Sequence, residues 1–499
     1  MKAYSSRSLA LIAILVMAPM FLLFQNCKSS FSAASVQQAA ASSLSPSGVP
    51  TAKRIAATTQ LEADLIIADG AQAALTLTVT PTETTQVILI ADGRFFGSGL
   101  AQMQIALDGV AVGNSSVIDW TNSLHPVQHS FDNIALVELS PGSHQISLLA
   151  TNSTNAQFTV GAKSILSVMK SSAQIVQQTR LTADTGTFAF DFGLQPNTNP
   201  TVFSFPTTEF LALPKLEGPS AVLLSTRAYL SGDINLPVPD SHIGDALIGI
   251  SFNGVVPTSN EATWSNNDIC NCAELQAPMF AQALTLGTEA VSATAIASKN
   301  PWDFTLNGVA TENPAQFIIG ADATMIGIQG PAILGGNYTE GLVITSPTST
   351  TDDYICVGSV PADYSTVNPV IPVGVAAWPG CPAITNTLQT VIAETIVTIP
   401  ESHDGTLMIL AKTRIQGDTN DSGIAILGIS VDGVQQGSVG VQQIALGAGN
   451  SQRTLAASFL ATGSSRLFPG PHKIQVWVQP IGNFSHLVAV RDLPLLFFD

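Results

Sequence analysis

One short pattern occurs three times in this chain and restricts the folds open to it. An Asp-Gly or Asn-Gly pair stands between two short apolar runs in residues 104–112, 249–255 and 428–434. Such a pair is the strongest local signal for a two-residue β-hairpin, because a type I′ turn requires positive φ at both central residues. The three occurrences therefore predict one β unit that is repeated three times.

The segments before the hairpins repeat as well. Residues 90–97 align without gaps with residues 410–417, and the middle copy, residues 224–229, aligns through its arginine, Arg227. This agreement raises the hairpin pattern above chance and supports a repeat that is longer than the turn itself.

A Pro-Gly turn followed by an alternating strand also recurs, in residues 141–146 and 469–474. Each copy carries a histidine, His144 or His472, directly after the turn. A catalytic group has no reason to recur in this way, whereas an imidazole can hydrogen-bond turn backbone. We therefore interpret both histidines as structural.

Composition and periodicity favour β structure throughout the body of the chain. Val, Ile and Thr are abundant, Gly and Pro number 39 and 29, and alternating runs such as residues 74–79 and 473–478 are typical of half-buried strands. About 440 residues are too many for one core. We place three repeats at 57–170, 171–330 and 331–499, the last with a long insertion.

The N-terminus has the composition of a targeting segment. Lys2 and Arg7 precede an apolar run, residues 9–24, which is shorter than the roughly 20 residues of a membrane span. The run ends in Phe-Gln-Asn-Cys, and residues 1–27 resemble a bacterial lipoprotein signal in which Cys27 is lipidated. The alternative is a cleaved secretory signal in which this cysteine has no role.

Residues 28–56 are rich in Ser, Ala and Gln and are expected to form a flexible tether. Lys28 stands where an aspartate would retain a lipoprotein at the inner membrane, so the resemblance implies the outer membrane. The expected contact with membrane is through the N-terminal lipid only.

The net charge of the chain disfavours one class of partner. The net charge is −17, which disfavours binding to nucleic acid. Only 11% of residues are charged, and the mean hydropathy is +0.33. Such an apolar chain predicts that much surface is buried between the copies.

Four cysteines follow Cys27, and an even number in an exported chain predicts disulfides. We pair Cys356 with Cys381, which bracket part of the third-copy insertion, and this leaves Cys270 with Cys272. Crossed pairings stay open. A thiolate metal site is the alternative, for which a lone Cys-x-Cys without a clear second ligand pair is only a weak signal.

No familiar catalytic motif is present. Residues 418–423 imitate the start of a calcium loop, but position twelve is Ile429 instead of glutamate, so we expect a polar hairpin. His125 and His129 are expected in one loop that faces solvent. The sequence thus predicts no enzyme activity, no cofactor and no metal.

The most suggestive binding feature is a tryptophan beside amide side chains in the loop after the hairpin. Copy one has Trp120 and Asn122, and copy two has Trp264 and Asn266 at nearly the same offset. A sugar stacks its apolar face on such a ring, while its hydroxyls bond to the amides. The alternative is that the rings only cap the end of a sandwich. Trp477 is expected in the core.

The order of Asp-Gly hairpin, Pro-Gly-x-His-x-Ile strand and Gly-Ala followed by an apolar last strand resembles the jelly-roll heads related to tumour necrosis factor and C1q. It is also similar to phage fibre tips and to trimeric adhesive fibres of predatory bacteria. The resemblance implies three tandem antiparallel β-sandwiches of jelly-roll type that pack as an intrachain pseudo-trimer. The alternative is a row of immunoglobulin-like sandwiches.

The function implied by this resemblance is that of a lipid-anchored cell-surface adhesion protein binding glycan or protein. The chain is expected to be monomeric and surface-exposed at the outer membrane. A structural envelope spacer is the main alternative. A polysaccharide-acting enzyme would need paired carboxylates in a cleft, and the sequence offers no such pair.

Overall fold

In the computed structural model the chain divides into two compact units, Met1–Pro50 and Thr51–Asp499. The structure describes residues 55–68, 70–119, 128–153, 157–170, 322–331, 389–401, 403–417, 422–444, 452–484 and 487–490, together with shorter strand segments between 175 and 319, at 342–345, at 354–357 and at 495–498. Among these residues no helix is long and apolar enough to cross a membrane.

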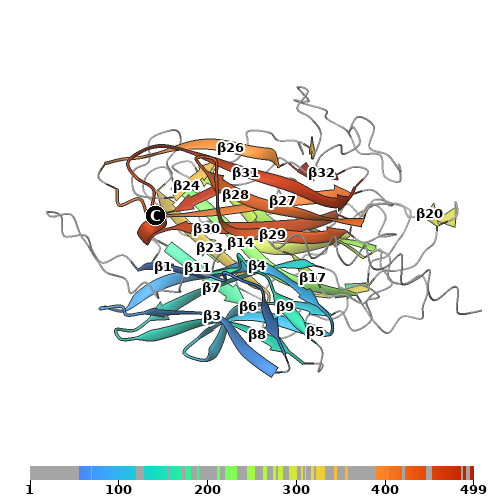
Figure 1. Ribbon diagram of the computed structural model, residues 1–499, viewed down its shortest axis with the longest axis horizontal. Coiled ribbons are helices and arrows are strands. Elements are labelled where there is room, and N and C mark those ends of the chain that lie inside the picture. The colour runs from blue at the N-terminus through green and yellow to red at the C-terminus, as the bar shows by residue number, and fades with distance from the viewer. Residues whose placement is uncertain are drawn as a thin grey trace, which may run out of the picture. The chain divides into compact units, whose positions relative to one another are not determined.

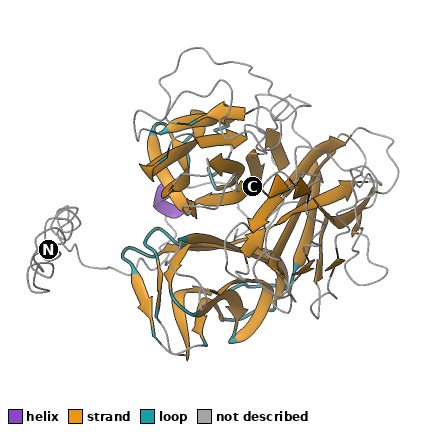
Figure 2. Ribbon diagram, turned by 90° about the vertical axis from the view of Figure 1, so that its right-hand side faces the viewer, coloured by secondary structure: helices purple, strands orange, loops and turns teal. Residues whose placement is uncertain are grey.

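The described chain is built from strands (Figure 2), and its helical content is one 3-10 turn, η2 (Gly463–Ser465). Every strand pairing in the described residues is antiparallel, and the strands at residues 74–79 and 473–478 lie where alternation predicts them. The prediction of an all-β, antiparallel fold is confirmed.

The first pair of sheets, blue to green in Figure 1, consists of strands between residues 56 and 170. One sheet has the order β1 (Ala56–Gln60), β10 (Ile165–Lys170), β4 (Thr85–Gly97), β9 (Phe158–Val160), β2 (Leu65–Ile67), with β7 (His129–Leu139) also paired to β4. The other has the order β3 (Gly70–Val79), β8 (His144–Asn152), β5 (Leu100–Leu107), β6 (Val110–Asp119).

The same strand order recurs in the middle of the chain. One sheet has the order β11 (Ile175–Arg180), β23 (Thr324–Pro331), β14 (Ser220–Gly232), β22 (Gln316–Ile319), β12 (Phe188–Ala189), with β17 (Glu274–Gln276) and β18 (Met279–Leu284) on β14. The other has the order β13 (Leu211–Leu213), β19 (Val291–Lys299), β15 (Gly244–Phe252), β16 (Ala262–Asn266), and β20 (Thr305–Leu306) pairs separately with β21 (Val309–Ala310).

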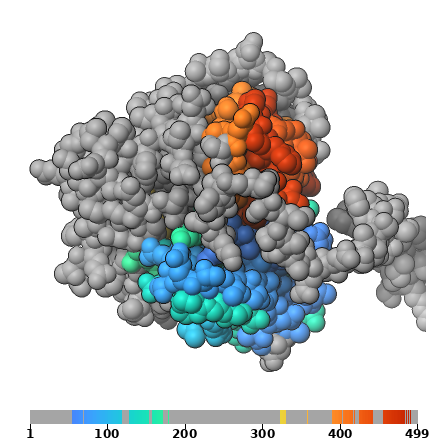
Figure 3. Space-filling model, turned by 90° about the vertical axis from the view of Figure 1, so that its left-hand side faces the viewer, coloured from blue at the N-terminus to red at the C-terminus, as the bar shows by residue number. Residues whose placement is uncertain are grey.

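It recurs again in the C-terminal part, orange to red in Figure 1. One sheet has the order β24 (Leu342–Thr345), β33 (Leu495–Phe498), β27 (Leu407–Gly417), β32 (Leu487–Val490), β25 (Tyr354–Cys356), with β30 (Gln452–Ala461) on β27. The other has the order β26 (Thr390–Ile399), β31 (Gly470–Asn483), β28 (Ser422–Val431), β29 (Val434–Ile444). The surfaces of the first and last sheet pairs are coloured in Figure 3.

Two of the three predicted hairpin turns lie in the described residues, and both are confirmed. Asp108 and Gly109 have φ of 50° and 83°, and Asp432 and Gly433 have 51° and 80°. These are the positive angles that a type I′ turn demands. The middle turn, at Asn253-Gly254, lies outside the described residues.

A β-bulge follows each of these turns. Gly113 and Gly437 have φ of +69° and +68°, and a Cβ at either position would overlap the carbonyl oxygen of Ile134 or of Ser458, respectively. Both glycines lie where the hairpin register shifts. Close backbone approach between the two sheets therefore requires glycine here.

The next residue joins the two sheets through its side chain. Ile134 N donates to Asn114 Oδ1 at 2.7 Å, and Ser458 N donates to Ser438 Oγ at 2.8 Å. Asn114 is 1% exposed and Ser438 0% exposed. Two parts of the chain thus use the same buried link, although the side chains differ.

Each of the two well-described sheet pairs encloses an apolar core. In the first, Phe95 meets Phe131 and Phe158 edge to face, with ring centroids 5.9 and 6.3 Å apart. In the last, the core side chains come from both sheets, β27 and β30 on one side and β28 and β31 on the other. Trp477 of β31, expected in the core, is buried, but it lies on the opposite face of β31 from the core residues Ile474, Val476 and Val478, with its ring over Gly428.

A third apolar cluster joins residues from all three parts of the chain. Its buried members are Ile88, Ile90, Ile134, Met169, Ile326, Ile328, Met408, Leu410 and Leu460. Polar contacts accompany it: Ser458 Oγ donates to the buried carboxylate of Asp92, and Ser130 Oγ donates to Val441 O at 3.0 Å. Much apolar surface is therefore buried between distant parts of the sequence.

The strand register corrects the sequence alignment of the middle copy. Lys163 and Asp322 both have left-handed φ, and Ile165 and Thr324 follow them by two residues, so Ile165 and Thr324 are equivalent positions in the first and middle copies. Ile165 pairs with Asp92, and Thr324 pairs with Arg227. Arg227 is therefore equivalent to Asp92, and the alignment with Arg94 is wrong by two residues. A shift by two preserves the inward-outward alternation, so the sequence pattern could not detect it.

One histidine assignment is also wrong. His129, expected in a solvent-facing loop with His125, is the first residue of β7 and is buried. The reason is that β7 continues its pairing with β4 as far as Phe95. His125 lies outside the described residues.

Candidate functional site

The first sheet pair has two ends with different connections. The described chain begins at Ile55, and β1 starts at Ala56, which pairs with Met169. At the same end, Thr85 at the start of β4 pairs with Leu139 at the end of β7. We call this the tether end, because the predicted tether enters here.

The Asp108 turn also lies at the tether end. The connections from β3 to β4 and from β7 to β8 are short and start and finish there, since Val79 of β3 pairs with His144 of β8. Leu107, directly before the turn, pairs with Ile146, two residues beyond His144.

The opposite end, which we call the loop end, carries the connection from β6 to β7. Asp119 at the end of β6 pairs with Leu100, and His129 at the start of β7 pairs with Phe95. Trp120 and Asn122 fall in this connection but lie outside the described residues. Their segment therefore begins and ends at the loop end.

Trp264 and Asn266 were expected in a loop, and the structure places both in strand β16 instead. They pair with Ala246 and Gly244 at the start of β15. Since β15 and β16 occupy the places of β5 and β6 in the sheet order, this is the loop end of the middle sheet pair. The structure does not describe the side chains of these two residues.

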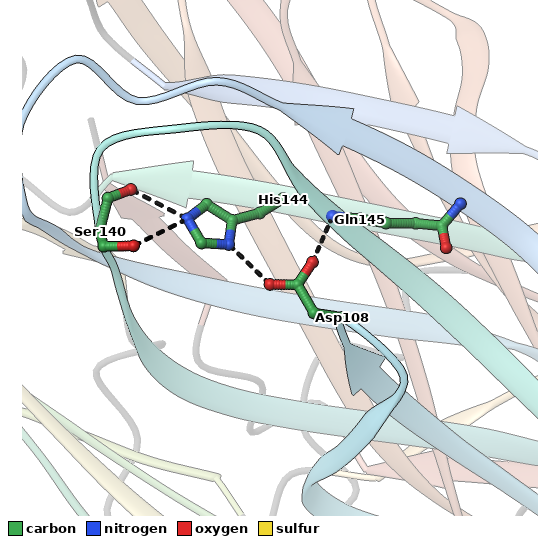
Figure 4. A network of polar contacts seen from close by, with 4 residues as sticks. All are labelled: Asp108, Ser140, His144 and Gln145. Atoms are coloured by element: carbon green, nitrogen blue, oxygen red, sulfur yellow. Dashed lines mark hydrogen bonds and ion pairs between the residues drawn. The ribbon is translucent and has the colours of Figure 1, made fainter.

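The described residues contain a polar network at the tether end that sequence reasoning found only in part (Figure 4). His144 Nδ1 donates to Asp108 Oδ2 at 2.7 Å, and Gln145 N donates to Asp108 Oδ1 at 2.8 Å. His144 Nε2 donates to Ser140 O at 2.9 Å and lies 3.4 Å from Ser140 Oγ. The imidazole thus joins the β5–β6 turn to the β7–β8 turn.

The network recurs in the C-terminal part. His472 Nδ1 donates to Asp432 Oδ2 at 2.7 Å, and Lys473 N donates to Asp432 Oδ1 at 2.8 Å. His472 Nε2 donates to Phe468 O at 2.6 Å. Phe468 therefore stands where the first network has Ser140.

The hydrogen bonds of this network shift the pKa values of the aspartate and of the histidine in the directions that favour their charged forms. The hydrogen bond from His144 and that from the Gln145 amide lower the pKa of Asp108 below 3.8. The bonds to Asp108 and to the Ser140 carbonyl raise the pKa of His144 above 6.5. The hydrogen bond from His472 likewise lowers the pKa of Asp432.

Serine, histidine and aspartate in contact suggest a nucleophilic triad, but the geometry opposes it. A catalytic imidazole needs a free Nε2 lone pair to accept the hydroxyl proton. Here both ring nitrogens of His144 donate, to a carboxylate and to a carbonyl, so the ring is an imidazolium. The second network also has no hydroxyl. Both networks are turn clamps, in agreement with the structural interpretation of His144 and His472.

Comparisons with known proteins give no family. No family model matches the chain, and no curated protein does. Similar solved structures include the insecticidal delta-endotoxin Cry8Ea1 of Bacillus thuringiensis, at 10% identity and a TM-score of 0.17, with 84% of this chain and 54% of that one covered. Latent PorU of Porphyromonas gingivalis matches at 8% identity and 0.16, covering 79% and 32%.

A third similar structure is the VP2 subviral particle of infectious bursal disease virus, at 7% identity and a TM-score of 0.12, covering 88% and 81%. The chain thus spans about half the length of the endotoxin chain and about a third of the PorU chain. At these TM-scores none of the three similarities supports a statement about the function of this chain.

The described residues contain no metal site and one of the cysteines expected in disulfides. In the part of the chain that the structure describes, no group of three or more His, Cys, Asp or Glu side chains could hold a metal ion. Cys356 ends β25, whereas Cys27, Cys270, Cys272 and Cys381 lie outside the described residues. The disulfide pairings therefore stay predictions, as does lipidation of Cys27.

Proposed function

We propose that this chain is a lipid-anchored surface recognition protein in which three jelly-roll copies present a ligand-binding loop end away from the membrane. The observation that carries the proposal is the opposition of the two ends. The tether enters at Ala56, whereas the connection that holds Trp120 starts and finishes at the other end of the same sandwich. An anchored protein of this form exposes that connection to ligands on an envelope or on another cell.

The sheet order supports jelly-roll copies. Between Val87 and Asp92 the neighbours of β4 are β10 and β7, so one sheet has the order β1, β10, β4, β7, and the facing sheet has the order β3, β8, β5, β6. Two four-stranded antiparallel sheets with these crossovers form the double Greek key of a jelly roll. The same order in the other two parts supports three copies.

Contacts between the copies support packing about a pseudo-threefold axis. The shared apolar cluster draws on β4, β7 and β10, on β23, and on β27 and β30. Thr462 Oγ1 donates to Ala56 O at 3.4 Å at the tether end, and Ser130 meets Val441 nearer the loop end. These contacts favour parallel alignment of the first and last copies over a row of separate sandwiches.

Anchoring through Cys27 places the tether end nearest the outer membrane. Trp120 and Trp264, with Asn122 and Asn266, then provide stacking and amide groups at the far ends of two copies. A glycan is the ligand class that this combination suits best, and a protein is the second.

The main alternative is a structural envelope spacer. The turn clamps and the apolar cluster between copies favour it, since both stabilise a rigid body. A spacer would keep these features and bind no ligand.

The deciding experiment measures binding of the fragment 28–499 to a panel of envelope polysaccharides and to whole bacterial cells. We expect the parent to bind and a Trp120→Ala, Trp264→Ala double variant to bind at least about tenfold more weakly, because stacking on an aromatic ring contributes about 1 kcal/mol or more per site. A Trp378→Ala variant is the matched control, because it removes a tryptophan from the third-copy insertion and leaves Trp120 and Trp264 in place.

Equal binding by the parent and the double variant would move the site elsewhere. No binding by the parent to any polysaccharide or cell would favour the spacer. Mass spectrometry of the protein purified from membranes tests lipidation of Cys27 separately.

A further inference from the structure

Large apolar side chains are exposed at the tether end. Val110 is 67% exposed, Val434 59% and Phe468 64%. Val110 and Val434 directly follow the two Asp-Gly turns. These three side chains are more than half exposed and lie in the turns of the first and last copies, which indicates a surface that is covered in the working protein.

The turn clamps hold these side chains in place. Asp432 precedes Val434 by two residues and is bonded to His472, whose Nε2 holds the carbonyl of Phe468. The guanidinium of Arg466 lies 5.9 Å from the centre of the Phe468 ring. The tip of the third copy, which is the turn segment that contains Arg466 and Phe468, therefore presents an aromatic ring with a cation beside it.

The same tip is close to the point where the tether enters. Thr462, four residues before Arg466, donates to the carbonyl of Ala56 at 3.4 Å. The part of the predicted tether that precedes the described residues, 28–54, has 27 residues, counted from the sequence. A flexible chain of that length has a root-mean-square span of about 30 Å, which gives an effective concentration in the millimolar range.

We propose that the tether-end face, defined as Val110, Val434, Arg466 and Phe468, seats on the lipid surface that holds the anchor. The inference rests on the proposed anchoring through Cys27. Aromatic and aliphatic side chains enter the boundary between headgroups and acyl chains, and a guanidinium binds headgroup phosphate. The net charge of −17 selects a zwitterionic surface over an anionic one.

Seating has a consequence for orientation. A long tether alone leaves the body free to turn, whereas weak contacts through this face hold the loop end away from the bilayer. Because the anchor already confines the face near the lipid, even a weak intrinsic affinity suffices.

The test uses flotation of the fragment 28–499, which carries no lipid and keeps every described residue, with vesicles of phosphatidylethanolamine and phosphatidylcholine. The parent is expected to float with the vesicles at high lipid concentration. A Val110→Thr, Val434→Thr, Phe468→Ser variant should partition about tenfold less. Ile66→Thr is the matched control, because Ile66 is 61% exposed in β2 at the loop end, and it should float like the parent.

A variant that gains a fluorescence signal on lipid binding separates weaker lipid binding from poor folding of the triple variant. Phe468→Trp should show a blue shift of its added emission when these vesicles are present, and Ile66→Trp should not. No flotation by the parent, equal flotation by the triple variant, or a shift only for Ile66→Trp would overturn the inference. Glycan binding and Cys27 lipidation are measured separately: loss of glycan binding refutes the proposed function and leaves this inference intact, whereas an unlipidated Cys27 refutes the anchoring on which the inference rests, whatever the flotation result.

Discussion

At the residue scale, the His144 clamp makes stability depend on pH. The pKa of His144 is raised above 6.5, so its contribution is complete below that pH and is lost as the pH rises through the folded-state pKa. The pKa of Asp108 is lowered below 3.8, so its contribution is complete above that pH and is lost on acidification. The clamp is therefore strongest between about pH 4 and 6.5.

We expect His144→Gln to lower the melting temperature at pH 5.5 by about 1 °C or slightly more, and to change it less at pH 8.5, where a larger fraction of the wild-type imidazole is neutral. Thermal unfolding at both pH values measures this. In an Asp108→Asn background the same substitution should have little effect at either pH. An equal loss at pH 5.5 and 8.5 in the wild-type background would contradict the charged clamp.

Gly113 provides a second prediction at this scale. Gly113→Ala should lower the free energy of unfolding by about 2 to 4 kcal/mol, because its Cβ would overlap the Ile134 carbonyl and its φ is +69°. Gly109→Ala is the control, since Gly109 has a φ of +83° in open space and should lose only about 1 kcal/mol. Urea unfolding distinguishes the two, and similar losses would disprove the close approach.

At the element scale, β6 is attached to the facing sheet through Asn114. Its Oδ1 accepts from Ile134 N at 2.7 Å, and its Nδ2 donates to Asp132 O at 3.0 Å, with the side chain buried. Asn114→Ala leaves these buried backbone groups unpaired and should remove about 2 to 3 kcal/mol of stability. Denaturant midpoints measure the loss.

The C-terminal part provides the matched variant, because Ser438 makes the equivalent link to Ser458 N at 2.8 Å. Asn114→Ser should therefore retain more stability than Asn114→Ala. If the two variants are equally unstable, the side-chain acceptor is not what joins these sheets.

At the element scale, some features could be predicted from sequence patterns and others could not. The turns at Asp108 and Asp432 were predictable, since positive φ is a local property of Asp-Gly. The clamp partners were not predicted, although an Asp that begins each turn and a His after each Pro-Gly recur together. Trp264 was placed in a loop because nothing local shows that β16 continues its pairing to Gly244.

At the scale of the whole molecule, the apolar cluster shared by three parts of the chain couples their unfolding. We expect calorimetry to show one transition, and Leu410→Ala to lower the temperature of that whole transition, because Leu410 is 3% exposed and packs in the cluster. Val434→Ala, an exposed control, should leave it unchanged. Separate transitions of which only one shifts would contradict the pseudo-trimer.

The sequence by itself determined the all-β class and the two described Asp-Gly turns. Each depends on local backbone preference or on the period of two along a strand, which neighbouring residues already contain.

Only the tertiary structure decided which strands pair, that Arg227 is equivalent to Asp92, and that Ser458 bonds to Asp92 from 366 residues away. It also decided that the start of β1 lies at the opposite end of the first sheet pair from the end of β6 and the start of β7. These depend on register and on contacts between distant segments, which a shift by two residues changes without altering the sequence pattern.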